Sequence, residues 1–494
     1  MSNFYTDVKA VAAGIALLLG GAAAASPQGL PDSVVSVVSV VSVEDAVSGL
    51  VADALAANLE LDAAGGEVAQ RLAALDQARA LYLPSLDFSA RYTRANGGRT
   101  IDFPVGDLLN PVYASLNQIT GSARFPAVQN QEINFQRTRE QDTSVSLTQP
   151  LYDARISAGR MAAQSQYEAE SAARVALAGR IERDMRVAYY RWLQARAQIG
   201  IFDATLELAT ENRRVNESLF RNGKITRDLV FRAEADQLEV QQSQLGAQNA
   251  ERLAQSYVNL IRNAPFDRTL PSVVVGDPDI DRLRNDLAAH AAQPALRLAP
   301  LQETAVRQRY ELRQLDAIAA AAAAGERLAR AAFKPRLAFA FDAGTQGETY
   351  TFTNEDRYLL ASVVLKFNFF AGGGDEAGIA SARAVERQAR DSRSLQEQQI
   401  RFQVQQALQD FEFTEASLGT AAKRVEAAAG AFRIASRKRD LGQINQAEFI
   451  DSRRAMTDAQ LNLNLTRFAA LGSLAELEYA LGADSLHVPP EGQP

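Results

Sequence analysis

The sequence has no cysteine and only two histidines, His290 and His487, among its 494 residues. A catalytic thiolate, a cysteine-ligated zinc ion or a Ser-His relay therefore has almost no residues from which to be built. These absences argue against a hydrolase and against a metalloenzyme. We predict a protein that is not an enzyme and that carries no cofactor.

An excess of positive charge is also missing, because the formal net charge is -7. A protein that neutralises nucleic-acid phosphates needs a basic surface. The arginines of this chain instead alternate with acidic residues, as they do on solvated helix faces. We therefore predict no nucleic-acid partner.

Long hydrophobic runs are absent, and the one short run lies near the N-terminus. Lys9 precedes the apolar residues 11–19, and small residues at 22–25 precede Ser26. This run is shorter than the roughly 20 apolar residues of a membrane span. We interpret residues 1–25 as a secretory signal, with a short membrane anchor as the alternative. Any later insertion into a membrane would need a closed β-barrel, since only helices and closed barrels satisfy their backbone in lipid.

The sequence does contain an internal duplication. The turn glycines Gly223 and Gly442 are 219 residues apart, and apolar residues upstream pair at the same offset: Met185 with Val404, Trp192 with Phe411, Ile199 with Leu418, and Leu206 with Val425. A repeat of this length fixes architecture before any single motif does. The first copy has an insertion between about Gly97 and Arg139, rich in Asn, Gln, Gly and Pro, which we predict to be an exposed loop.

Four segments alternate apolar and polar residues, which is typical of strands with one face in lipid and the other in water. They are residues 86–93, 144–148, 336–342 and 362–369. Half of a soluble sandwich would show the same alternation, but the flanking helices leave no second sheet to cover the apolar face. Because even a small barrel needs about eight strands, several protomers must each contribute four.

Two long helical segments accompany the strands. Residues from about Arg155 to Phe220 contain no proline and place apolar residues at alternating spacings of four and three; residues 404–432 repeat this pattern, with Glu415 as the polar exception. Such a heptad seam predicts coiled-coil packing. About 65 helical residues would reach roughly 100 Å. A two-stranded coiled coil remains the alternative.

Together these features resemble the TolC family of outer-membrane efflux and secretion ducts, from about Val43 to Gly482. The segments that carry the resemblance are Val43-Glu44-Asp45-Ala46, Tyr82-Leu83-Pro84-Ser85-Leu86, Gln149-Pro150-Leu151-Tyr152 and Phe220-Arg221-Asn222-Gly223 in the first copy, and Gln293-Pro294-Ala295-Leu296, Phe333-Lys334-Pro335 and Phe369-Phe370-Ala371-Gly372-Gly373 in the second.

The resemblance implies an α+β fold in which a strand hairpin and a long helical hairpin occur twice. It also implies a homotrimer that forms one twelve-stranded transmembrane β-barrel in the outer membrane and a long α-helical barrel in the periplasm. The expected function is that of a passive channel in a tripartite efflux or type I secretion system. Its partners would be membrane lipid, a periplasmic adaptor protein and an inner-membrane transporter of the RND or ABC type. The alternative is a structural coiled-coil tether of the cell envelope.

The predicted organisation follows the duplication. It comprises the signal (1–25), a low-complexity lead-in (26–43), the first repeat (44–264), an equatorial segment between the repeats (265–300), the second repeat (301–482) and a flexible tail (483–494).

The resemblance also implies site residues at the helix turns. Gly223 and Gly442 would be the tips that dock the adaptor, and a plain capping glycine is the alternative for each. Glu448 and Asp451, one helical turn apart, match the positions at which the family lines its entrance. In a trimer they would form a cation-favouring ring of carboxylates. The alternative is an ordinary solvated face beside Arg453 and Arg454.

The sequence departs from the best-known family member at the entrance lock. Ile444 occupies the place of an arginine that helps to close the entrance, and Arg439 occupies the place of a tyrosine. A lock in this protein would have to be built differently. We consider Arg439 itself and Asp228, near the first turn, as the possible gate partners.

Overall fold

The computed structural model describes residues 42–276, 279–282, 284–285, 297–350 and 353–482. The chain from Ser42 onward forms one unit. The predicted signal, nearly all of the lead-in, the tail and part of the equatorial segment lie outside the described residues. Within the described residues, no helix combines the length and the apolar character that crossing a membrane requires.

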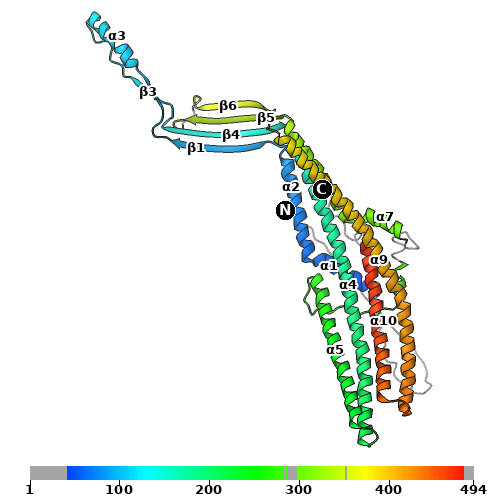
Figure 1. Ribbon diagram of the computed structural model, residues 1–494. Helices are drawn as coiled ribbons and strands as arrows, with labels where there is room; N and C mark the ends of the chain where they lie inside the picture. Colours follow the sequence, from blue (N-terminus) through cyan, green and yellow to red (C-terminus); the bar gives the residue numbers. More distant parts are fainter. Residues whose placement is uncertain (1–41, 277–278, 283, 286–296, 351–352, 483–494) are drawn as a thin grey trace, which may run out of the picture. The chain divides into compact units, whose positions relative to one another are not determined.

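Four strands form one antiparallel sheet in the order β1-β4-β5-β6 (Figure 1). Their bounds are β1 Ser85–Arg94, β4 Arg139–Tyr152, β5 Arg336–Gly347 and β6 Arg357–Lys366. The register places Leu86 beside Leu147 and Leu147 beside Phe341. Because side chains alternate between faces, the sheet has one apolar face and one polar face. Each sequence copy contributes one hairpin, as predicted.

The insertion in the first copy is not only a loop, and this prediction was wrong in part. It contains a two-stranded ribbon of β2 (Thr100–Phe103) and β3 (Gln131–Asn134), with helix α3 (Val105–Thr120) between them. The side chains of Asn110 and Asn117 each donate to and accept from the returning backbone, at Val128 and Phe125 respectively. The asparagines that suggested a loop therefore bind the helix to the segment that leads from it to β3.

The last strand begins and ends earlier than predicted, at Arg357 and Lys366. Phe367 and Phe369 therefore lie beyond its end. Their rings meet edge to face at 4.7 Å. The chain then turns through Gly372 and Gly373, which both have positive φ. Glycine adopts this backbone conformation readily, and the turn leads the chain into the next helix.

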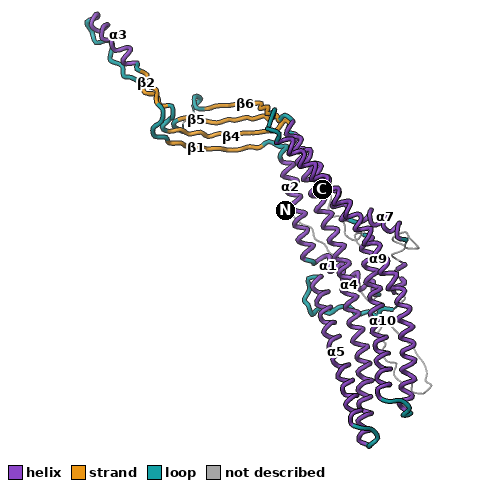
Figure 2. The backbone as a smooth tube through the Cα atoms, viewed as in Figure 1, coloured by secondary structure: helices purple, strands orange, loops and turns teal. Residues whose placement is uncertain are grey.

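Two helices of almost equal length follow the two hairpins. Helix α4 (Ala154–Arg221) has 68 residues and α9 (Gly374–Asp440) has 67. Each turns back into a shorter helix, α5 (Arg227–Ile261) and α10 (Gln446–Leu481) respectively, as Figure 2 shows. The other described helices of this unit are α1 (Val43–Ala57), α2 (Leu59–Ala80), α7 (Leu298–Gln308), α8 (Tyr310–Arg330) and the short η1 (Ala331–Phe333).

The predicted heptad seam is the interior of the helical region. Met185 and Val404, its partner at the repeat offset, are both fully buried, and Trp192 and Phe411 are each 1% exposed. These side chains belong to one large apolar core shared by α1, α4, α7, α9 and the end of α10. Glu415, the polar exception in the seam, forms an ion pair with Arg284.

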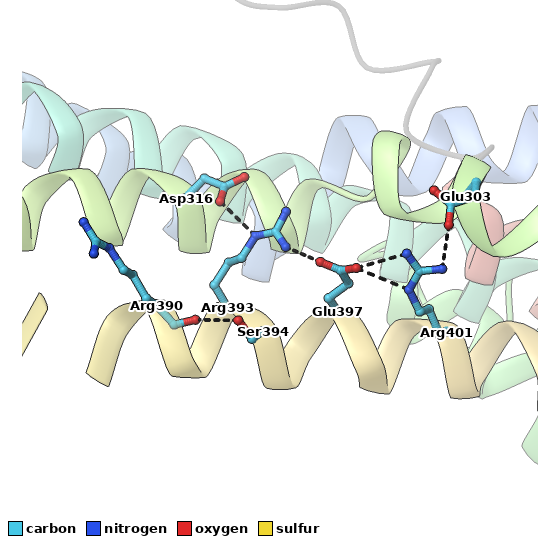
Figure 3. Close-up of polar contacts among 7 residues, drawn as sticks. All are labelled: Glu303, Asp316, Arg390, Arg393, Ser394, Glu397 and Arg401. Atoms are coloured by element: carbon cyan, nitrogen blue, oxygen red, sulfur yellow. Dashed lines mark hydrogen bonds and ion pairs between the residues drawn. The ribbon is translucent and has the colours of Figure 1, made fainter. Parts of the chain in front are cut away.

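A row of alternating charges joins α7 and α8 to α9 (Figure 3). Arg393 donates to Asp316 at 3.0 Å and also to Glu397, which accepts from Arg401 at 3.0 Å; Arg401 donates in turn to Glu303 at 2.8 Å. Isolated pairs on a surface are each worth about 1 kcal/mol or less. As a connected row they fix the position of α7 and α8 along α9.

Candidate functional site at the helix turns

Two equivalent turns connect the long helices to their partners, at the same end of the helices (Figure 1). Gly223 and Gly442 have φ values of +67° and +68°. In each turn, the amide of the residue after the glycine donates to the carbonyl four residues before the glycine, at 2.9 Å and 2.8 Å. This is the Schellman pattern that ends a helix on a left-handed residue.

Nothing lies within 4 Å of a Cβ built on Gly223 or Gly442. The positive φ, and not close packing, is therefore what requires glycine at these positions. The residues around both turns are exposed, so their backbone is accessible to another molecule.

Glu448 and Asp451 lie just after the second turn, on the first turns of α10. Asn445 caps this helix, and its Oδ1 accepts from the Glu448 amide at 2.9 Å. The two acidic side chains line an open hollow of about 480 Å³ with residues such as Ala431 and Ser452. Within the described part of the chain, neither carboxylate has an ion-pair or hydrogen-bond partner. Both charges therefore face open space.

The two arginines that follow do not neutralise this acidic pair. Arg453 is 2% exposed, and it donates to Asp236 of α5 at 2.7 Å. Arg454 lies 3.5 Å from Asp236 and donates to Glu239 at 2.5 Å. Both guanidinium groups thus face the neighbouring hairpin, and they join α10 to α5.

The two possible gate partners are not in contact. Asp228 is exposed in the first turn of α5, whereas the Arg439 guanidinium lies 4.1 Å from the centre of the Phe449 ring and 2.9 Å from Asp440. Among the described residues, no ion pair joins Asp228 to Arg439. Ile444 is partly buried in the same turn.

Arg439 acts on α4 instead. A hydrogen bond from Arg214 lowers the pKa of the Glu211 carboxyl, and the positive charge of Arg439 lowers it further. Arg439, near the end of α9, thus adds to the positive field at Glu211 of α4.

The interior near the turns contains several buried polar groups, which the sequence analysis missed. Asn212 and Asn216 are buried on α4, and the hydroxyls of Thr205 and Thr457 lie 3.2 Å apart. Asn216 follows Ala209 by seven residues and so continues the heptad seam as a polar residue. An asparagine at a seam position was the feature of the sequence that could have indicated these buried polar groups. In the described residues, no group of three or more His, Asp or Glu side chains could hold a metal ion.

Comparisons with known proteins give consistent results. The sequence model described as outer membrane efflux protein matches residues 50–262 and 301–483. Comparison with curated protein sequences gave no match.

Several solved structures share the fold. CusC, in a study of its folding and transmembrane channel formation, has a TM-score of 0.73 at 17% identity, with 89% of this chain and 92% of CusC covered. The CmeC outer membrane channel of Campylobacter jejuni has a TM-score of 0.72 at 14% identity, with 89% and 86% covered. The outer membrane protein VceC of Vibrio cholerae has a TM-score of 0.69 at 18% identity, with 88% and 96% covered.

Proposed function

The chain belongs to the outer membrane efflux protein family, and from this membership we propose that it is the outer-membrane channel of a tripartite efflux or type I secretion system. Substrates delivered by an inner-membrane transporter pass through it without chemical change. Membership confirms the family predicted from the sequence and its location in the outer membrane. The family consists of channel proteins and not of enzymes.

The observation that carries the proposal is the pair of free edges on the sheet. β1 and β6 each have only one neighbour in the strand order β1-β4-β5-β6, and both have 10 residues. An edge strand presents unpaired backbone groups, which lipid cannot satisfy. Pairing β6 of one copy with β1 of the next removes every edge. Three copies then give twelve strands, enough to close a barrel.

Exposed apolar residues on the helices support the same assembly. Along α5 they recur at spacings of seven or eight and are each 54–64% exposed: Phe231, Leu238, Leu245, Leu253 and Leu260. Along α9, Phe402, Phe413 and Ile434 are similarly exposed. Large exposed apolar stripes mark interaction surfaces. In the proposed homotrimer, helices of adjacent copies cover them and form the periplasmic helical barrel.

The helix turns form the periplasmic entrance in this proposal. Glu448 and Asp451 of three copies make a ring of carboxylates, and such a ring favours cations. Gly223 and Gly442 present exposed backbone to a periplasmic adaptor, which links the channel to an RND or ABC transporter. A coiled-coil tether would need the helices, but it would not need a sheet with one exposed apolar face and two free edges.

The test is a single-channel recording in a planar bilayer, comparing the wild type with Glu448→Gln/Asp451→Asn. Asp76→Asn, which removes an exposed carboxylate on α2 away from the turns, is the control. We expect cation-selective currents that lose selectivity only in the double variant. A membrane-inserted trimer that passes no current would contradict the proposed function, and unchanged selectivity would remove the two acids from the entrance.

A further inference from the structure

Charge is distributed unevenly over the apolar face of the sheet. The strand register places alternate residues of β1, β4, β5 and β6 on this face, including Leu86, Phe88 and Phe341. In these four strands the only charged residues on this face are three arginines: Arg94, Arg139 and Arg357. The acidic residues of the same strands, Asp87, Glu140, Asp142 and Asp342, all lie on the polar face.

The three arginines gather at one end of the face. Along β1 the residues on the apolar face are, in order, Leu86, Phe88, Ala90, Tyr92 and Arg94. Along β6 the residues on the same face are, in order, Arg357, Leu359, Ala361, Val363 and Leu365. The arginines therefore mark one boundary of the apolar band. This end carries the insertion between β1 and β4, whereas the long helices leave from the other end.

Two of these arginines repel each other. Arg94 and Arg139 are direct cross-strand partners, so their Cβ atoms lie about 5 Å apart, and like charges in this arrangement destabilise a sheet. All three side chains are exposed. In the described part of the chain none of them has an acidic partner. Arg91, three residues before Arg94 but on the polar face, lies 3.4 Å from Asp142.

We propose that Arg94, Arg139 and Arg357 bind the phosphate groups of lipid headgroups in the outer leaflet of the membrane. A guanidinium group offers a planar fork of donors that fits phosphate oxygens in a bidentate manner. An anion bridging Arg94 and Arg139 would remove their mutual repulsion. Basic residues beside an apolar band are also where lipid phosphates lie. The inference rests on the proposed barrel, whose apolar face meets the lipid.

The test measures binding of a bisphosphorylated glycolipid, lipid A, to the detergent-solubilised protein by native mass spectrometry. The variant is Arg94→Gln/Arg139→Gln/Arg357→Gln, and the matched control is Arg91→Gln on the opposite face of β1. We expect the triple variant to bind lipid A at least about tenfold more weakly, because it loses all three cationic partners of the lipid phosphates. The control should bind as the wild type does.

Two further arms identify the ligand. Lipid A without its phosphates should bind the wild type as weakly as lipid A binds the triple variant, and excess inorganic phosphate should not displace lipid A. Equal binding of lipid A by wild type and triple variant overturns the proposal, as does displacement by inorganic phosphate. Replacing all three arginines by lysine keeps the charge but removes the planar fork of donors, so binding should lie between that of the wild type and that of the glutamine variant. Such partial recovery separates a lost site from a misfolded protein.

Planar-bilayer conductance separates this inference from the proposed function. If the wild type conducts current but lipid A binds equally well without the arginines, only the proposed lipid site is contradicted. If binding depends on the arginines while no conductance is found, the lipid site stands and the channel proposal fails.

Discussion

The helical region has two interiors of different composition. Around α1, the middle of α4 and the end of α10, one large apolar core contains Trp192, Phe411 and Met185, all nearly inaccessible to solvent. Nearer the turns, the separate apolar cluster consists of Phe202, Ala209, Val240 and Ala247. Buried polar and charged groups lie beside it, among them the Arg453–Asp236 pair and Asn216.

This difference assigns different tasks to the two regions. Burial of large apolar side chains supplies most folding stability, so the large core holds the fold together. A buried ion pair or amide contributes little net stability, because removing its charges from water offsets much of the attraction. Segments with few apolar contacts open at low free energy. The region near the turns is therefore the part that can rearrange, as the proposed entrance must.

The largest expected effect comes from the large core. Trp192→Ala removes a ring that stacks on Tyr189 at a centroid distance of 5.7 Å and an indole that donates to Glu251 at 2.8 Å. We expect a loss of about 3–5 kcal/mol, measured as a fall in the melting temperature of the whole protein. Phe202→Ala, in the small cluster of the same helix, should lower that temperature much less. Equal falls would refute the contrast between the regions.

Breaking the buried ion pair should loosen only the region near the turns. Asp236→Asn leaves the Arg453 charge buried without its partner, both side chains being 3% exposed, which costs about 3 kcal/mol or more. Hydrogen exchange should accelerate in residues 446–457 and stay unchanged in residues 181–193. Replacing both residues by apolar ones, Asp236→Leu/Arg453→Met, should restore slow exchange. Faster exchange throughout the protein would mean that the two regions unfold together.

Replacing two different glycines by alanine should change stability in opposite directions. Gly442→Ala forces a side chain onto a residue with φ of +68° and should destabilise by about 1–2 kcal/mol. Gly430 lies inside α9, and a Cβ there also meets nothing within 4 Å. Gly430→Ala should therefore stabilise by about 0.5–1 kcal/mol. Thermal melting of the two variants measures both, and a shift of the same sign would contradict this account.

Acid should weaken the large core through Glu311. Burial alone would raise the pKa of this carboxyl, but hydrogen bonding and attraction from Arg309, with a hydrogen bond from Tyr479, leave the pKa below its ordinary value of 4.5. A depressed pKa stabilises the folded state above the unfolded pKa, and this stability is lost as the pH falls below about 4.5. Glu311→Gln should make melting less sensitive to pH in that range. An unchanged pH dependence would exclude Glu311 as a source.

The sequence predicted the parts of the fold that follow local periodicity. Alternation located all four strands of the sheet, and heptad spacing identified Trp192 and Phe411 as core residues. The helix in the insertion was missed because asparagines such as Asn110 and Asn117 are typical of loops. Their side chains bind the backbone of residues that come later in the chain, and the local sequence does not indicate those contacts. The Arg453–Asp236 pair joins residues 217 positions apart, and no local pattern indicates such a contact.

The site was predicted unevenly for the same reason. Helix-ending glycines leave a local signature, so both turns lie where the sequence placed them. Whether Glu448 and Asp451 are neutralised depends on which way Arg453 and Arg454 face, and that follows from the packing of α10 against α5. The predicted roles of these acids, and of Asp228 and Arg439, remain predictions.

The most direct test of the account is the single-channel conductance of Asp236→Asn beside that of the wild type, in planar bilayers and at equal numbers of inserted trimers. If the region near the turns is the constriction and the Arg453–Asp236 pair holds it, the variant should show larger or longer openings. An assembled variant whose conductance and open times equal those of the wild type would contradict the claim that this region controls the channel.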